Sequence, residues 1–180
     1  MKKIMFNDKY GLTKAVIEGR KTMTRRAVQG KYLRIYEDMS RLGRPVHPLE
    51  EWLIRNAAAY KVGEVVAVAQ SGKEIYNQLQ QRYGNTSDAA LEFMEMYRGL
   101  AMWRNKMFVP ADLCPNKICI TDIKVERLQD ISSEDAFREG ITVYCSSPRS
   151  AFAALIDKVC GKGTWELNPY VFAYTFELIR

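Results

Sequence analysis

The sequence contains a single histidine and no apolar run long enough to cross a membrane. His47 lies in the turn-forming stretch GRPVHP, which favours an exposed position. A Ser-His-Asp or Cys-His system would depend on this one residue. The sequence therefore argues against histidine-based nucleophilic catalysis.

Cysteine is also scarce and is not arranged for metal binding. The cysteines at 114, 119, 145 and 160 include no CxxC pair, and the chain is much longer than a disulfide-stapled miniprotein. With one histidine beside them, we expect no zinc site, and nothing in the sequence calls for a cofactor. Cys119 and Cys160 lie in apolar segments, where a reduced cysteine usually packs as a small core residue.

The N-terminus does not resemble a signal peptide. It carries two lysines but only a three-residue apolar patch before Asn7 and Asp8. A hydrophobic content of 47% with 27% charged residues is typical of a globular protein. We therefore expect a cytoplasmic protein with no membrane partner, and its 180 residues fit one domain.

Positive charge is concentrated in the first quarter of the chain. Residues 1–44 contain twelve Lys or Arg and four Asp or Glu, a balance of +8, whereas residues 45–180 contain fifteen and seventeen, a balance of −2. A one-sided field of this kind attracts a polyanion, and nucleic acid is the obvious class. A solvated basic edge would give the same composition, so both readings stay open.

Hydrophobic periodicity predicts alternating helices and strands. Apolar spacing of three and four residues predicts helices at 10–18, 49–60, 132–141, 147–163, and two more within 72–102 that are divided at 84–87, with Ser87 as a cap. Alternation or buried β-branched runs predict strands at 22–28, 32–39, 65–70, 116–129 and 168–179. Short strands separated by single helices indicate an α+β domain built on a small, mixed or antiparallel β-barrel.

The stretch GRKTMTRR, residues 19–26, contains the most suggestive chemistry. Threonine is a nucleophile only if a base takes its proton, and Lys21 lies three residues before Thr24. The neighbouring arginines lower the pKa of that lysine, in the direction that a base requires, and they could hold a phosphate or polarise a carbonyl. A solvated basic turn, a phosphate-binding strap and a catalytic strip all fit these residues. The GKGT stretch at 161–164, by contrast, follows a helix and is interpreted as a helix-ending turn.

The pattern Gly19-x-Lys21-x-x-Thr24-x-Arg26 resembles the G-x-K-x-x-T-x-R signature of the ASCH superfamily. The segments YKVGEVVAVAQ and ITDIKVERLQDISSEDAFREGI and the aromatic closing strand are similar to successive elements of that family. The resemblance implies a single PUA-like β-barrel domain over residues 1–180, with flanking helices and insertions at about 28–60 and 72–110. Chains of this longer type resemble bacterial and phage proteins.

The resemblance also implies a function. The relation of the ASCH superfamily to PUA domains suggests that the chain binds RNA, or a nucleotide or modified nucleoside, in a basic cleft beside the signature. The residues that we expect to contact such a ligand are Arg20, Arg25, Arg26 and Gln70.

A branch of small ASCH proteins consists of amidohydrolases that deacetylate acetylated cytidine. The working residues of that branch fall here on Lys21, Thr24 and Glu139. This chain has Ala69, Gln70 and Ser71 where many longer ASCH proteins have an arginine-glutamate pair and an aromatic residue.

Three functions therefore stay open. The first is a binding module for RNA or a nucleoside, and the second is an acetylcytidine-type amidohydrolase. The third is an accessory protein of bacteria or phages that uses the helical insertion to bind a partner. Trp103 and Trp165 could stack on bases, although such tryptophans are more often core residues.

Overall fold

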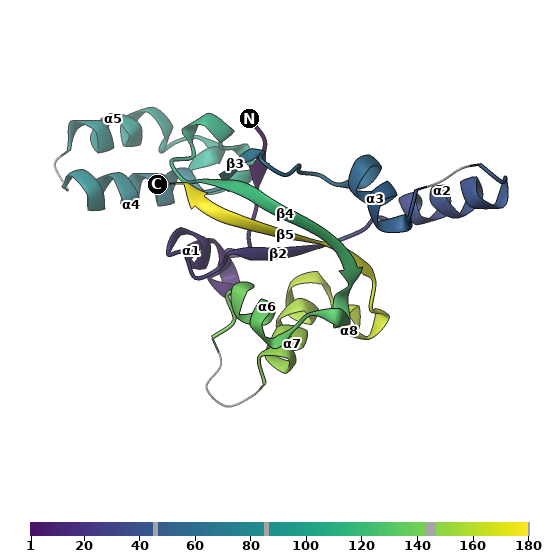
Figure 1. Ribbon diagram of the computed structural model, residues 1–180. Helices are drawn as coiled ribbons and strands as arrows, with labels where there is room; N and C mark the ends of the chain where they lie inside the picture. The colour runs from purple at the N-terminus through teal and green to yellow at the C-terminus, as the bar shows by residue number, and fades with distance from the viewer. Residues whose placement is uncertain (45–46, 85–86, 143–146, 180) are drawn as a thin grey trace. The chain divides into compact units, whose positions relative to one another are not determined.

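The computed structural model describes residues 1–44, 47–84, 87–142 and 147–179 (Figure 1). The chain divides into two compact units. Unit 1 comprises Met1–Lys14, Val65–Ile118 and Leu178–Arg180, and unit 2 comprises Ala15–Glu64 and Cys119–Glu177. The insertions expected at about 28–60 and 72–110 remain predictions.

The strands of the described residues are β1 (Lys3–Ile4), β2 (Met23–Ala27), β3 (Val65–Val68), β4 (Lys117–Arg127) and β5 (Tyr170–Ile179). Hydrogen bonds join them in the order β1-β3-β4-β5-β2, with β1 parallel to β3 and β2 antiparallel to β5. Among the described residues β1 and β2 are edge strands, so this mixed sheet is open. The α+β class is confirmed, whereas the closed PUA-like barrel is not.

All of the helices expected from the sequence are present, and serine side chains cap the first turn of three of the helices. Their bounds are α1 (Leu12–Ile17), α2 (Gly30–Arg41), α3 (Leu49–Ala57), α4 (Gly72–Tyr83), α5 (Asp88–Tyr97), α6 (Ser133–Arg138), α7 (Pro148–Cys160) and α8 (Thr164–Leu167). The side chains of Ser71, Ser132 and Ser147 accept hydrogen bonds from first-turn backbone amides of α4, α6 and α7. Ser87 is the N-cap residue of α5, although its side chain accepts no such bond.

Short 3₁₀ turns complete the described secondary structure. They are η1 (Asp8–Tyr10), η2 (Ala101–Trp103), η3 (Lys106–Phe108), η4 (Ala111–Leu113) and η5 (Leu128–Asp130). Gly161 of the GKGT stretch is the C-cap of α7, as the sequence predicts for a helix-ending turn, and Thr164 is the first residue of α8.

The strand predicted at 32–39 is wrong, because these residues lie within α2. The half-buried residues of this segment are Tyr32, Leu33, Tyr36 and Met39, which repeat at helical spacing. The Tyr36 ring packs edge-on against Trp52 of α3, with ring centroids 5.6 Å apart. A helix places these side chains on one face, whereas a strand would divide them between two.

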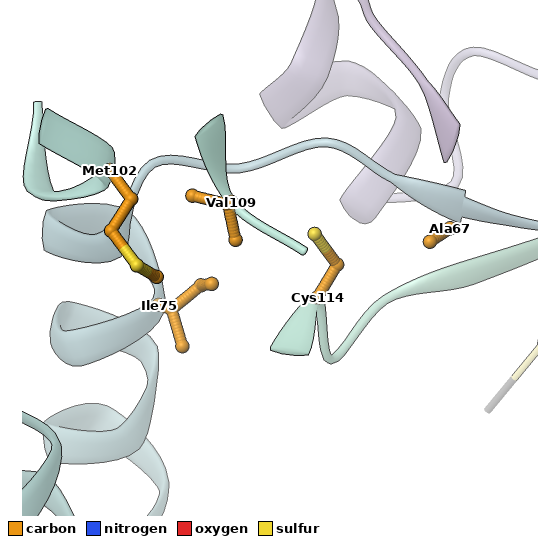
Figure 2. Packing of buried hydrophobic residues seen from close by; sticks show 5 residues of the cluster. All are labelled: Ala67, Ile75, Met102, Val109 and Cys114. Atoms are coloured by element: carbon orange, nitrogen blue, oxygen red, sulfur yellow. The ribbon is translucent and has the colours of Figure 1, made fainter. Parts of the chain in front are cut away.

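The core of unit 1 joins its helices to β3. Its buried members are Ala67, Ile75, Met102, Val109 and Cys114, which come from β3, α4, η2 and the segment before β4 (Figure 2). Burial raises the pKa of the Cys114 thiol. The segment from α4 to η4 is therefore tied to β3 by a shared apolar core.

The core of unit 2 packs α6 and α7 against the sheet. Its buried cluster consists of Leu128, Ile131, Ala136, Phe152 and Val171. The strand β5 contributes four consecutive buried residues, 171–174. This core fixes the end of α6 close to β2, which carries the signature.

The remaining single-residue predictions have mixed outcomes. His47 is exposed, as expected. Cys119 is half-buried, but Cys160 is exposed at the last residue of α7, so the prediction of a core position is wrong for Cys160. Its apolar neighbours Ile156 and Val159 are half-buried, and Ile156 packs against the core of unit 2. Cys145 lies outside the described residues.

Candidate functional site

The signature begins just after α1 and continues into the strand β2. The backbone amides of Arg20 and Lys21 both donate to the Ala15 carbonyl, at 2.9 and 3.0 Å, which closes α1 and starts the extended segment. In β2, Thr24 pairs with Tyr174 of β5 and Arg26 pairs with Phe172. The signature is therefore an extended strip held by α1 on one side and β5 on the other.

Lys21 and Glu139 form a buried ion pair. The Lys21 ammonium donates to the Glu139 carboxylate at 2.5 Å and to the Glu139 backbone carbonyl at 2.8 Å. Lys21 is 2% exposed and Glu139 4%. The structure thus brings together two of the three residues expected to be catalytic, although 118 positions separate them.

The pKa of Lys21 is lowered, as the sequence predicts, but for a different main reason. Burial is the largest cause, because it disfavours the charged ammonium. Glu139 acts in the opposite direction, and Arg26 and Arg25 add smaller lowering effects. The neighbouring cations, which the sequence indicates as the cause, are therefore secondary.

Gly140 allows the close approach of Lys21 to the end of α6. This glycine follows Glu139 and has φ of +89°, a conformation that favours glycine. A Cβ atom at this position would lie 3.2 Å from the Lys21 Cβ and 3.4 Å from the Ala15 Cβ. The ion pair thus depends on a glycine that the sequence marks only as a helix end.

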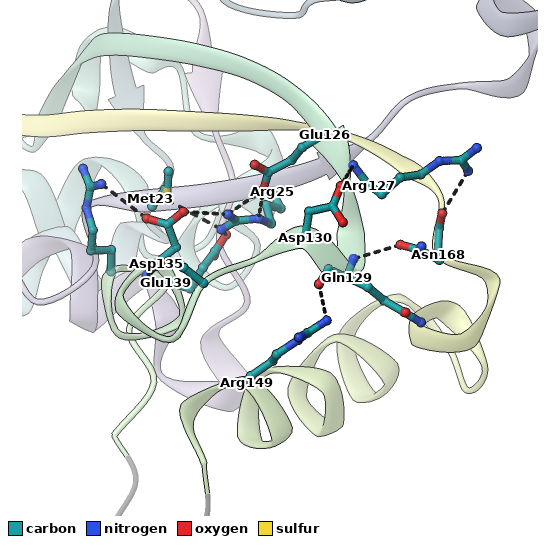
Figure 3. A network of polar contacts seen from close by, with 12 residues as sticks. Met23, Arg25, Glu126, Arg127, Gln129, Asp130, Asp135, Glu139, Arg149 and Asn168 are labelled. Atoms are coloured by element: carbon teal, nitrogen blue, oxygen red, sulfur yellow. Dashed lines mark hydrogen bonds and ion pairs between the residues drawn. The ribbon is translucent and has the colours of Figure 1, made fainter.

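Arg25 is surrounded by three carboxylates (Figure 3). Its Nε donates to Glu126 at 2.8 Å, its Nη2 to Asp135 at 3.1 Å and its Nη1 to Glu139 at 3.2 Å. Burial opposes the Arg25 charge, but Glu139 and Glu126 outweigh it and raise the pKa of Arg25. Glu139 therefore bridges Arg25 and Lys21, and we call these five residues the buried charge cluster.

Thr24 is buried, and its cross-strand partner is Tyr174. The Arg25 guanidinium contacts the Met23 sulfur at 3.6 Å, so Met23 and Arg25 share a face of β2. Because strand side chains alternate, Thr24 and Arg26 project from the other face. The side chains of the signature in β2 therefore point to two faces. Arg25 joins the buried charge cluster on one face, and Thr24 and Arg26 lie on the other.

A pocket of about 250 Å³ opens beside Arg26. Its lining combines this cation with an amide and aromatic rings: Arg26, Ala27, Gln29, Ala57, Ala59, Tyr60, Phe172 and Tyr174. We call it the β2–β5 pocket. The Tyr174 ring lies 5.4 Å from that of Tyr60 and 5.9 Å from that of Phe172.

Burial raises the pKa values of Tyr60 and Tyr174, so both phenols are neutral at physiological pH. The Tyr174 hydroxyl accepts a hydrogen bond from the Ala59 amide at 3.0 Å. No sequence motif selects these rings as ligand-binding residues. The alternation in YVFAYTF already places Phe172 and Tyr174 on one face of a strand, but Tyr60 comes from a distant segment.

The other expected ligand-binding residues lie in different settings. Arg20 is exposed and forms an ion pair with Glu18 at 2.6 Å. Gln70 belongs to unit 1, is 1% exposed, and accepts a hydrogen bond from Asn116 at 2.7 Å. Their roles in binding remain predictions.

Comparison of the chain with protein-family models, curated proteins and solved structures found no match. Within the described ranges, no helix combines the length and apolar character that a membrane span requires. The same residues contain no group of three or more His, Cys, Asp or Glu side chains placed to hold a metal ion. The function is therefore argued from the site itself.

Proposed function

We propose that unit 2 binds a modified nucleoside, free or within RNA, in the β2–β5 pocket. The observation that carries this proposal is the group of aromatic rings beside Arg26. Proteins that recognise unpaired bases stack them on aromatic rings and on arginine, and they read the base edges with polar groups. Gln29 and the neutral phenol of Tyr60 supply such groups here.

The pocket size supports a ligand with one base. Its volume of about 250 Å³ lies just below the ~300–1,000 Å³ of typical drug-sized sites. A single base or nucleoside is the appropriate class, and a dinucleotide cofactor is too large. Arg26 in the pocket lining adds a cation that attracts a phosphate-bearing form of the ligand.

Calorimetric titration with a panel of free and modified nucleosides tests the proposal. We expect a saturable signal for at least one member and a loss of at least about fivefold in affinity for Tyr60→Leu, which removes a ring. Arg34→Gln on α2 is the matched control for Arg26→Gln, because Arg34 is exposed and outside the pocket lining. Equal losses in the two arginine variants would contradict a role for this pocket.

A second candidate function is an amidohydrolase that removes the acetyl group of an acetylated cytidine. Its supporting observation is the buried Lys21, whose pKa is lowered and whose ammonium contacts Glu139. Because Thr24 projects from the face of β2 opposite the buried charge cluster, this mechanism has the Thr24 hydroxyl attack the acetyl carbonyl while the neutral Lys21 amine takes its proton through a water molecule. The C–N bond breaks, and the amine leaves with a proton that Glu139 relays.

Water then hydrolyses the acetyl ester on Thr24 and releases acetate. Arg26, on the same strand, stabilises the oxyanion. Incubation with N4-acetylcytidine, followed by chromatography for cytidine, tests this candidate. We expect Thr24→Ala to abolish turnover and Thr24→Ser to retain part of it. Undiminished turnover in Thr24→Ala would exclude this mechanism, and binding without turnover would leave the first proposal standing.

A further inference from the structure

A second hollow lies in unit 1, among α4, α5 and η2, and its volume is about 660 Å³. The residues that line it are Lys73, Tyr76, Asn77, Met94, Arg98, Trp103 and Arg104. We call it the α4–α5 pocket. The two helices that form it lie side by side (Figure 1). None of the functions considered above uses these residues together.

The cations of the α4–α5 pocket are exposed. They are Lys73, Arg98 and Arg104, and none of them forms an ion pair with another residue in the described part of the chain. The pocket lining includes no Asp or Glu. Three cations around one hollow, without a carboxylate among the lining residues, give a local positive field that favours an anion.

The pocket also has a fixed aromatic platform. The rings of Tyr76 and Trp103 are 5.6 Å apart, with an angle of 47° between their planes. The Tyr76 hydroxyl accepts a hydrogen bond from Gln80 at 2.7 Å. A Cβ atom on Gly72 would lie 3.1 Å from the Trp103 Cα, so the first turn of α4 packs directly against Trp103. The absence of a side chain at Gly72 leaves room for Trp103 against α4.

We propose that the α4–α5 pocket binds single-stranded nucleic acid. Lys73, Arg98 and Arg104 contact consecutive phosphates, while a base stacks on the platform of Trp103 and Tyr76. Cations that follow a backbone beside aromatic rings are the combination that sequence-tolerant single-strand binding requires. This site belongs to unit 1 and is independent of the β2–β5 pocket in unit 2.

Fluorescence anisotropy with a fluorescein-labelled ten-nucleotide RNA tests the proposal. The double variant Arg98→Gln/Arg104→Gln should bind on the order of tenfold more weakly, and the log–log slope of its salt dependence should be shallower by about 0.7 for each phosphate that it no longer neutralises. Arg82→Gln is the matched control, because Arg82 is exposed on α4 and outside the pocket lining. It should bind within about twofold of wild type. An equal loss per charge in the control would overturn the proposal.

The base contact needs its own test. Trp103→Leu should weaken binding by at least about fivefold, and Trp103→Phe should retain most of the affinity. An abasic ten-nucleotide strand should bind more weakly than the RNA, because it keeps the phosphates and lacks the stacking groups. If Trp103→Leu does not fold, the abasic strand still decides, and equal binding of the two strands would overturn the stacking assignment.

The two proposed sites are separable in the same assay. If Arg26→Gln abolishes RNA binding while the Arg98→Gln/Arg104→Gln variant binds like wild type, the α4–α5 pocket is not the site, and the proposal for unit 2 gains. The reverse pattern supports the α4–α5 pocket. Absence of binding to the wild-type chain would overturn the inference for the α4–α5 pocket.

Discussion

The buried charge cluster of unit 2 and the α4–α5 pocket of unit 1 place the same residue types in opposite settings. Lys21 and Arg25 are buried and are held by carboxylates at 2.5–3.2 Å. The cations around the α4–α5 pocket are exposed, and its lining has no carboxylate. A buried cation requires its partners for the protein to fold, whereas an exposed cation without a partner is available to an anion.

This difference changes the meaning of the basic N-terminal quarter. The balance of +8 in residues 1–44 includes Lys21 and Arg25, which are neutralised by acids from later in the chain. It also includes Arg20, which pairs with Glu18. The signature therefore contributes less free positive charge than its composition indicates. Charge counted along a sequence does not locate the positive surface.

The largest effect should come from Arg25→Met. The substitution leaves Glu126, Asp135 and Glu139 close together without the guanidinium, and removal of one partner from a buried ion pair typically costs about 3–5 kcal/mol. Urea denaturation of the variant should show a loss of this size in the free energy of unfolding. Arg25→Lys, which keeps the charge but not the planar fork, should lose less. A loss under about 1 kcal/mol would mean that solvent already satisfies these carboxylates.

Lys21→Met should destabilise the protein less, by about 1–3 kcal/mol at neutral pH, because Glu139 keeps its contact with Arg25. The pH dependence gives a second measurement. The pKa of Lys21 is lowered in the folded protein, so between that pKa and 10.5 the unfolded chain binds more protons than the folded one. The free energy of unfolding of wild type, relative to Lys21→Met, should therefore rise with pH across this window.

Tyr60 and Tyr174 also titrate in this range, but their effect cancels when the unfolding free energy of Lys21→Met is subtracted from that of wild type, because both proteins contain these tyrosines. A difference in unfolding free energy that stays level up to about pH 10.5 and falls above it would show that the ion pair raises the pKa of Lys21.

Gly72→Ala should cost about 1–3 kcal/mol, because the new methyl group would meet the Trp103 backbone at 3.1 Å and has little room. Gly99→Ala is the control within unit 1, since a Cβ atom there meets nothing within 4 Å. That change should be neutral or stabilising by up to about 1 kcal/mol. Thermal melts of both variants check the contrast. If Gly72→Ala melts like Gly99→Ala, the platform is not tightly packed.

The smallest effects should come from exposed cations. Arg20→Gln breaks an ion pair whose side chains are 45% and 40% exposed, and the expected change in unfolding free energy is within about 0.5 kcal/mol. Arg104→Gln should be equally mild, because Arg104 is exposed and has no ion-pair partner among the described residues. Urea denaturation of both variants completes the comparison. A loss above about 2 kcal/mol in either would contradict the division between buried and exposed cations.

Local patterns predicted most of the secondary structure. Apolar spacing located α1, α3, α4, α5, α6 and α7, and alternation or buried β-branched runs located β2, β3, β4 and β5. The segment at 32–39 was assigned incorrectly because its apolar residues fit both periods over a short window. The open sheet, rather than a closed barrel, depends on strand pairing, which periodicity does not specify.

The candidate site was predictable only in part. The signature and its likeness to the ASCH superfamily selected Lys21, Thr24 and Glu139, and the structure joins Lys21 to Glu139. The role of Arg25 was less accessible. Its place in a basic stretch predicts a contact with a ligand. Its actual partners, however, are carboxylates of β4, of α6 and of the residue after α6, about 100 positions away.

The sequence by itself determined most of the helices and most of the strands, because capping and periodicity act over fewer than about ten residues. It also determined that positive charge is concentrated in residues 1–44. Only the tertiary structure decided which of those charges are neutralised, that Tyr60 joins Phe172 and Tyr174 around Arg26, and that Trp103 lies beside Arg98 and Arg104. These outcomes depend on contacts between distant segments, which form only when strand order and core packing bring them together.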